Sequence, residues 1–360
     1  MRHIPLVILL AFPLIAYGQD HENKNGKSNS PQDASYSKVT DSYSNAYASA
    51  IIGNGFAYGD GVVGDRSMEG RTFEFRFGKE ISVPAFLSEK LNLTDEKFRL
   101  DLFHFNEGHP DNNHRDGFGA QMVYRKPVSQ KLNLEFGLGP YFSMNTTTIK
   151  GTELNDAKLG ALLSVAALVD LERFSPGLHM RYALNHVSIP STHSSIALLV
   201  GVGKYFDNAP ARIQSGAYEN PTWLGVTAGI SQTNHGGSEG VPGFAAEAKK
   251  YYGNHWGASI SGIMEGDDDV RVHRHGVAVQ GWFVQPLDKN WAASAGIGPY
   301  VATNKRGSGN LQLHSLISFQ VERFIDTQWK GFINFSRVTT FTSKNDRDLF
   351  RIGIMRQFDI

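Results

Sequence analysis

The 360-residue chain contains no cysteine, and its charges balance, with 35 Lys and Arg residues against 35 Asp and Glu residues. The lack of cysteine excludes a disulfide scaffold, thiol catalysis, thiolate metal sites and an N-terminal lipoprotein anchor. The zero formal charge gives no reason to expect binding to nucleic acid, so we predict no nucleic-acid partner. Beyond Gly18, the sequence has no apolar run of the about 20 residues that a transmembrane helix needs.

The N-terminus has the pattern of a secretory signal peptide. Positive charge in the first residues precedes an apolar run over residues 4–16, and Ala16 and Gly18 are the small residues that allow cleavage after Gly18. Residues 19–45 are polar and almost free of aliphatic side chains, so we predict a disordered leader there. The sequence therefore predicts an exported protein with a signal peptide over residues 1–18.

The rest of the chain alternates between apolar and polar residues, which is the period of a β-strand with two unlike faces. The alternation is clear over residues 72–77, 98–102 and 132–138. The 38 glycines and 11% aromatic residues also favour strands joined by tight turns. Similar segments recur until each half of the chain holds about eight. We therefore predict an all-β fold.

The two halves of the chain are related by an internal repeat. Gln121 and the tripeptide Gly-Pro-Tyr at 139–141 recur, at the same spacing, as Gln280 and the tripeptide at 298–300. Self-similarity at a constant offset indicates a tandem duplication. We predict a first repeat over residues 46–206, a linker over 207–221 and a second repeat over 222–360.

Alternation alone does not decide which face of a strand meets water. Charged residues occupy the polar face, and we expect them to pair in a polar interior: Glu74, Arg76, Arg99, Asp101 and Glu135. Export, an even strand count and this charged face favour a transmembrane antiparallel β-barrel in the outer membrane. We predict two tandem eight-stranded barrels, because eight strands close around their own side chains. One sixteen-stranded barrel and a soluble periplasmic β-sandwich are the alternatives.

The segment Asn185-His186-Val187-Ser188 carries the sharpest candidate for chemistry. Residues two apart on a strand share a face, so His186 and Ser188 should stand side by side. An imidazole beside a hydroxyl can act as general base while the hydroxyl attacks an ester carbonyl. The plain alternative is a histidine and a serine in an ordinary strand, because spacing alone does not establish roles.

The first repeat resembles the lipid A 3-O-deacylase family on His186 and Ser188, on Glu107-Gly108, and on the segments 119–126, 132–142 and 181–206. The resemblance implies an eight-stranded outer-membrane barrel that needs no cofactor. It implies that His186 is the general base and Ser188 the nucleophile, and that lipid A or lipopolysaccharide is the partner. Two positions depart from the family pattern, since Ile189 replaces an asparagine and Ala197 stands near the position of a glutamate.

Two functions follow from these observations. The retained histidine and serine favour a carboxylic-ester hydrolase of the deacylase type. The departures at Ile189 and Ala197 favour a non-catalytic barrel that binds or passes an envelope lipid, a glycan or a small solute. The second repeat has no histidine over residues 338–342, so we do not expect this chemistry there.

Two polar clusters fall in predicted turns, and each is either a site for a divalent cation or lipid phosphate or an ordinary solvated turn. Four tryptophans are either members of interfacial girdles or core residues. The first cluster is His104, His109, Asp111, His114 and Asp116, the second is Asp267, Asp268, Asp269, His273 and His275, and the tryptophans are Trp223, Trp256, Trp282 and Trp291.

Overall fold

A computed structural model describes most of the chain after the polar N-terminal region. The predicted signal peptide over 1–18, the leader over 19–45 and the linker over 207–221 lie outside the described residues. Within the described ranges, no helix has the length and apolar character needed to cross a bilayer. The described ranges are 46–58, 72–81, 98–108, 113–149, 152–189, 194–206, 222–234, 239–253, 255–340 and 345–358.

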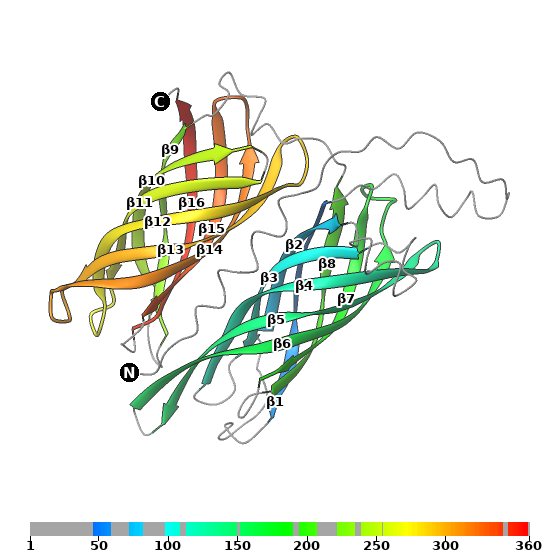
Figure 1. Cartoon of the computed structure of the whole chain (residues 1–360), viewed down its shortest axis with the longest axis horizontal. Coiled ribbons are helices and arrows are strands. Elements are labelled where there is room, and N and C mark those ends of the chain that lie inside the picture. The colour runs from blue at the N-terminus through cyan, green and yellow to red at the C-terminus, as the bar shows by residue number, and fades with distance from the viewer. Residues whose placement is uncertain are drawn as a thin grey trace, which may run out of the picture. The chain divides into compact units, whose positions relative to one another are not determined.

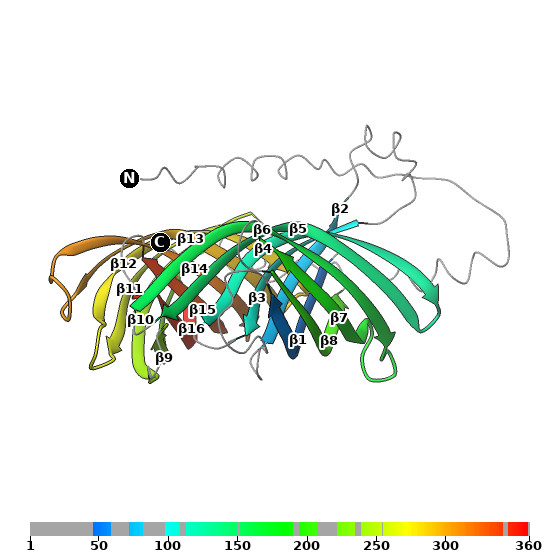
Figure 2. The same ribbon diagram turned by 90° about the horizontal axis from the view of Figure 1, so that it is seen from below.

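The first repeat forms a closed antiparallel barrel, in which each strand pairs with its neighbours in the chain and β8 pairs back with β1. Strands β5 and β6, of 18 and 19 residues, are its longest (Figure 2). The eight strands are β1 (Ala46–Tyr58), β2 (Thr72–Ile81), β3 (Phe98–Gly108), β4 (Asn113–Ser129), β5 (Leu132–Ile149), β6 (Thr152–Asp170), β7 (Leu178–Ser188) and β8 (Ser194–Phe206).

The second repeat forms a closed antiparallel barrel of its own, in which β16 pairs back with β9. Its eight strands are β9 (Thr222–Thr233), β10 (Val241–Tyr252), β11 (Trp256–Asp267), β12 (His273–Pro286), β13 (Trp291–Asn304), β14 (Leu311–Phe324), β15 (Trp329–Thr340) and β16 (Arg347–Phe358) (Figure 1).

Two closed eight-stranded barrels confirm the predicted fold class, and both alternatives are wrong. A sixteen-stranded barrel would pair β8 with β9 and β16 with β1. The backbone hydrogen bonds instead close within each repeat, between β1 and β8 and between β9 and β16. A β-sandwich would leave open edge strands, whereas closure leaves neither barrel with an edge.

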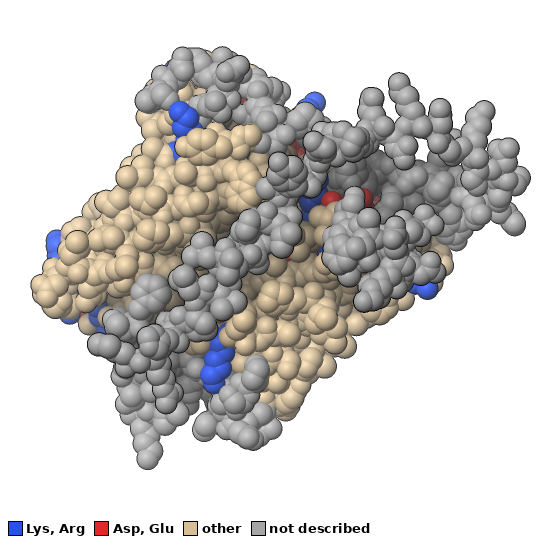
Figure 3. All heavy atoms as spheres, in the orientation of Figure 1, with Lys and Arg blue, Asp and Glu red and all other residues tan. Residues whose placement is uncertain are grey.

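The outward-facing side chains of both barrels are largely apolar. Figure 3 shows one face of the molecule, on which charged side chains occupy few places of the described surface. Apolar outward residues on several strands include Ile52, Leu163, Leu198 and Val200 in the first barrel and Val226, Phe244, Ile260 and Ile352 in the second, all exposed. An apolar band on the outside of a closed barrel is the surface that hydrocarbon requires.

Ion pairs fill the interior of the first barrel, as predicted from the alternation. Arg76 donates to Glu74 at 2.6 and 2.7 Å. Arg99 donates to Asp101 at 2.6 and 2.9 Å and to Glu135 at 2.7 and 3.1 Å. A charge removed from water is tolerated only with a partner, and each interior arginine has one. Further pairs are Arg76 with Asp101, Arg115 with Glu107, Arg125 with Glu80 and Arg181 with Glu135.

The interior contacts of the first barrel recur in the second, which supports the predicted duplication. Gln121 donates to the Leu162 carbonyl at 3.2 Å, and Gln280 donates to the Leu316 carbonyl at the same distance. Matching bonds at matching strands are expected when two repeats share one ancestral barrel. The ion pair of Glu107 with Arg115 likewise recurs as Glu265 with Arg274.

The centre of the second barrel is built from lysines and tryptophans. Glu322 accepts hydrogen bonds from Lys249 at 2.8 Å, and Lys330 approaches its other oxygen at 3.1 Å. The Lys249 ammonium lies 3.8 Å from the ring centre of Trp282, and that of Lys330 lies 4.9 Å from Trp223. Both tryptophans are therefore interior residues, where the cation–π contacts help to keep the two ammonium groups buried.

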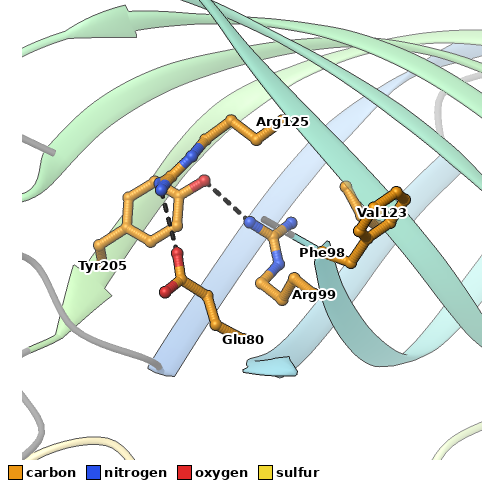
Figure 4. A pocket seen from close by; sticks show the side chains of 6 residues that line it. All are labelled: Glu80, Phe98, Arg99, Val123, Arg125 and Tyr205. Carbon is orange, nitrogen blue, oxygen red and sulfur yellow. Dashed lines mark hydrogen bonds and ion pairs between the residues drawn. The ribbon is translucent and has the colours of Figure 1, made fainter. Parts of the chain in front are cut away.

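A small polar cavity lies at one end of the first barrel (Figure 4). It has a volume of about 10 Å³, room for roughly one water molecule. Arg99 donates to the Tyr205 hydroxyl at 2.8 Å, and Arg125 donates to Glu80 at 3.0 Å across it. In the part of the barrel that the structure describes, side chains rather than a water-filled channel occupy the lumen, as expected for eight strands.

Candidate functional site

His186 and Ser188 lie on the outward face at the end of β7. The alternation of β7 places Asn185 and Val187 inside, and both are buried, whereas His186 is half-buried and Ser188 is exposed. Their Cα atoms are two residues apart, about 7 Å along the strand. The two predicted site residues therefore share a face, and that face is the one that meets the surroundings of the barrel.

The ring of His186 is held by two neighbours that come from other strands. Its Nδ1 lies 3.2 Å from the backbone oxygen of Ser195 on β8 and 3.3 Å from the hydroxyl of Tyr58 on β1. The Tyr58 ring stacks on the imidazole, with ring centres 6.1 Å apart and planes at 11°. We call Tyr58, His186 and Ser188 the rim cluster, because each lies at the end of its strand.

Tyr58 is the site residue that the sequence did not reveal. It is 128 positions from His186, and no spacing rule connects them. The two meet because β1 closes on β8, where Tyr58 pairs with Ser194, and Ser194 in turn pairs with Ser188.

The structure corrects the interpretation of the two departures from the family pattern. Ile189 is buried at 4% exposure within the interior cluster, so an asparagine side chain there would face the lumen. Ala197 is also interior, at 1% exposure, and pairs with Asn185 rather than with His186. The residue directly opposite His186 on the outward face is Ile196. Ala197 is therefore the wrong position for an acid meant to contact His186.

An apolar groove of about 470 Å³ runs along the same outer wall, below the rim cluster. We call it the wall groove. Its one charged lining residue, Glu74, directs its carboxylate into the barrel, where it binds Arg76 and Asn185. The outward side chains that line the wall groove are Ala50, Ile52, Phe73, Phe75, Met180, Val200 and Val202.

The polar clusters of the sequence do not form a metal centre in the described residues, since no group of three or more His, Asp or Glu side chains there could hold an ion. His109 and Asp111 lie outside the described residues, and the side chain of His114 is not described. The Nε2 atom of His104 lies 3.8 Å from Asp116 on the outward face of the first barrel.

The second cluster is a turn held by its own hydrogen bonds. Asp268 accepts from the backbone N–H groups of Val270, Arg271 and Val272 at 3.0, 2.7 and 2.8 Å, and from the Thr233 hydroxyl at 2.6 Å. Turn geometry accounts for aspartate here. On either side of Asp268, Arg306 pairs with Asp267 and Asp269, and His273 lies 3.3 Å from Asp267.

The Asp268 turn predicts an acid dependence of stability. Burial raises the pKa of this carboxyl, but the hydrogen bonds outweigh burial and lower the pKa from 3.8 to about 2. A lowered pKa stabilises the fold above the ordinary value, and the stabilisation is lost as pH falls from about 4 to 2. Asp268→Asn should remove this part of the pH dependence of urea unfolding, whereas Asp269→Asn, at an exposed carboxyl, should retain it. An equal pH dependence of the free energy of unfolding in the two variants would contradict the assignment of this effect to Asp268.

Three exposed tryptophans mark one end of the second barrel. Trp256, Trp291 and Trp329 are the first residues of β11, β13 and β15, so antiparallel pairing brings them to the same end. Each is more than a third exposed. Of the four predicted girdle candidates, Trp256 and Trp291 therefore lie on the outer wall, and Trp223 and Trp282 lie inside. A ring of outward aromatic residues is typical of the membrane interface.

The chain matches no family model and no curated protein. Among solved structures it is similar to neisserial surface protein A, at 14% identity over 45% of this chain and 97% of that chain, with a TM-score of 0.31. Ail, the attachment invasion locus protein of Yersinia pestis, aligns at 10% identity over 45% and 96%, with a TM-score of 0.32. An outer membrane channel from Pseudomonas putida F1 aligns at 10% identity over 88% and 96%, with a TM-score of 0.21.

At these identities and TM-scores the likeness is no more than a resemblance among β-barrels. The class of this protein is defined by its own strand pairing, which makes it an all-β protein of two closed eight-stranded antiparallel barrels. The resemblance to the deacylase family gains no support from a family model. The rim cluster and its surroundings therefore carry the functional evidence in this chain.

Proposed function

We propose that this chain is a non-conducting outer-membrane protein that binds an envelope lipid on the outer wall of its first barrel. The observation that carries the proposal is the position of the rim cluster, whose polar side chains lie on the outward face of a largely apolar wall. A polar group facing lipid is costly unless it has a partner, and it marks a functional site by default. In a membrane, the polar headgroup of a lipid can supply such a partner.

Two features support membrane embedding: the apolar outer walls of both barrels and the tryptophans at one end of the second barrel. The exposed outward side chains of both barrels are largely apolar, and Trp256, Trp291 and Trp329 lie together at one end of the second barrel. A soluble barrel would bury such a band or replace it with polar residues. The protein should therefore fractionate with the outer membrane and resist extraction by high salt. Recovery in the soluble periplasm would contradict the proposal.

The filled interiors argue against passage of a solute through either barrel. Ion pairs occupy the first lumen, and the Lys249, Glu322 and Lys330 cluster occupies the second. Eight strands leave room for side chains only, whereas channels need wider barrels. Reconstituted protein should therefore show no stable single-channel conductance in planar bilayers. Steady porin-scale currents would favour the channel function instead.

Headgroup binding at the rim cluster can be tested by photo-crosslinking in vesicles. A lipid A analogue with a diazirine on its sugar headgroup should label peptides that contain Tyr58 and His186 above the average of the outer wall. His186→Ala combined with Tyr58→Phe should lower this labelling severalfold, because two polar partners are lost. Tyr182→Phe is the matched control, since Tyr182 is an exposed tyrosine on the outward face of the same strand. Even labelling around the barrel would contradict the proposal.

Ester hydrolysis by His186 and Ser188 is the second candidate, and one contact favours it. An Nδ1–H group donated to the Ser195 carbonyl fixes the tautomer of His186 in which Nε2 carries the lone pair. A general base needs that lone pair to accept the proton of Ser188. A backbone carbonyl thus occupies the position that an orienting carboxylate takes in a full triad.

A further inference from the structure

We propose that the wall groove holds one acyl chain of the lipid whose headgroup lies at the rim cluster. This inference rests on the proposed function and adds a second binding element to it. The occupant is a saturated hydrocarbon chain, because the groove opens to the hydrocarbon side of the wall and its outward lining is apolar.

The floor and sides of the wall groove follow from the register of three strands. Ala50 on β1 pairs with Phe75 on β2 and with Val202 on β8. In the next outward row, Ile52 pairs with Phe73 and Val200. A small side chain between two larger ones leaves a depression in an otherwise even wall. Ala50 therefore forms the floor, and the aromatic rings of β2 form one side.

The distance between the wall groove and the rim cluster suits one lipid molecule. Ile196 pairs with His186, and Val200 lies four residues farther along β8. At about 3.3 Å per residue this separation is roughly 13 Å along the wall. A headgroup at the rim thus directs its chain down the strands toward the groove. Leu184, Leu198 and Asn54 make up the row between the two.

The shape of the wall groove distinguishes it from the rest of the outer wall. It is an open depression rather than an enclosed pocket, with a volume of about 470 Å³. An exposed flat wall makes only passing contacts, whereas a concave apolar surface encloses more of a chain and removes more of it from neighbouring lipid. Occupancy should therefore depend on the side chain at the floor.

The experiment uses the whole chain in phosphatidylethanolamine vesicles that contain a lipid A analogue with a diazirine at the end of one acyl chain. Crosslinks should concentrate on peptides that contain Ala50 and Phe75. Ala50→Trp fills the floor and should lower these crosslinks about tenfold, the effect of losing roughly two buried methylene contacts. Ala167→Trp, on the outward face of β6, is the matched control and should leave the pattern unchanged.

Two further measurements make the outcome decisive. If Ala50→Trp fails to fold, Val202→Trp tests the same groove from β8. Headgroup labelling of Tyr58 should persist in the groove variants, because the rim cluster is unaltered. Loss of preference for Ala50 and Phe75 with headgroup labelling intact would overturn the groove alone. Absence of both kinds of labelling would overturn the groove together with the proposed lipid site.

Discussion

Glu135→Ala should destabilise the first barrel by about 3–5 kcal/mol, the cost of removing one partner from a buried ion pair. Glu135 is 1% exposed and accepts from Arg99 at 2.7 and 3.1 Å, from the Tyr205 hydroxyl at 2.7 Å and from Arg181. Alanine would remove the carboxylate that the buried guanidinium groups of Arg99 and Arg181 share. Urea unfolding in detergent, followed by the gel shift between folded and heated barrel, measures the loss.

The control for Glu135 is a glutamate outside the barrel interior. Glu172 lies in the turn between β6 and β7 and is only half-buried, so Glu172→Ala should change the free energy of unfolding by less than about 0.5 kcal/mol. A second comparison, Glu135→Gln, keeps the shape and some hydrogen bonds but removes the charge, and it should fall between the two. Equal stability of Glu135→Ala and wild type would mean that the interior ion pairs do not hold the barrel together.

The sequence predicted the interior of the first barrel because period-two alternation determines the face of each residue. In residues 72–77, the phenylalanines and the charged residues can only point to opposite sides. Once closure is assumed, the charged side is the lumen, and Glu74 and Arg76 must find partners there. The observed Arg76–Glu74 pair is the direct outcome. Because Gln121 recurs as Gln280, the same reasoning applies to the interior of the second barrel.

The sequence predicted two of the three residues of the rim cluster. His186 and Ser188 are neighbours along one strand, so spacing was enough to place them on one face. Tyr58 reaches His186 through the closure of β1 on β8, and its position depends on the exact register of that pair. Register depends on turn geometry as well as on pattern, and a slip of one residue exchanges the two faces. The same limit applies to the glutamate of the resembling family, which falls near Ala197 in the sequence, whereas the register places Ile196 opposite His186.

Ser188→Ala should reduce release of fatty acid from lipid A by at least about 10³-fold if the second candidate function holds. The Ser188 hydroxyl would attack the ester carbonyl while His186 takes its proton and returns it to the departing alcohol, and water would then release the acyl group from Ser188. His186→Ala should lose a similar factor, since both residues act in one step. Thr339→Ala, at the equivalent outward position in the second barrel, should change little. Equal inactivity of wild type and both variants in detergent would leave lipid binding as the function.

If the barrel has lost catalysis, restoring an acid beside His186 tests whether the missing carboxylate is the cause. Ile196→Glu places a carboxylate directly across the strand pair on the outward face, within reach of the imidazole. An orienting acid contributes about 10⁴-fold in a full triad, so an imperfectly placed one should still raise the rate by roughly tenfold. Ala197→Glu is the matched control, because it puts the same charge one residue away, inside the barrel near Asn185 and Glu74. It should destabilise the fold and give no activity. Activity from Ala197→Glu but not from Ile196→Glu would mean that the reacting face of β7 is the inner one.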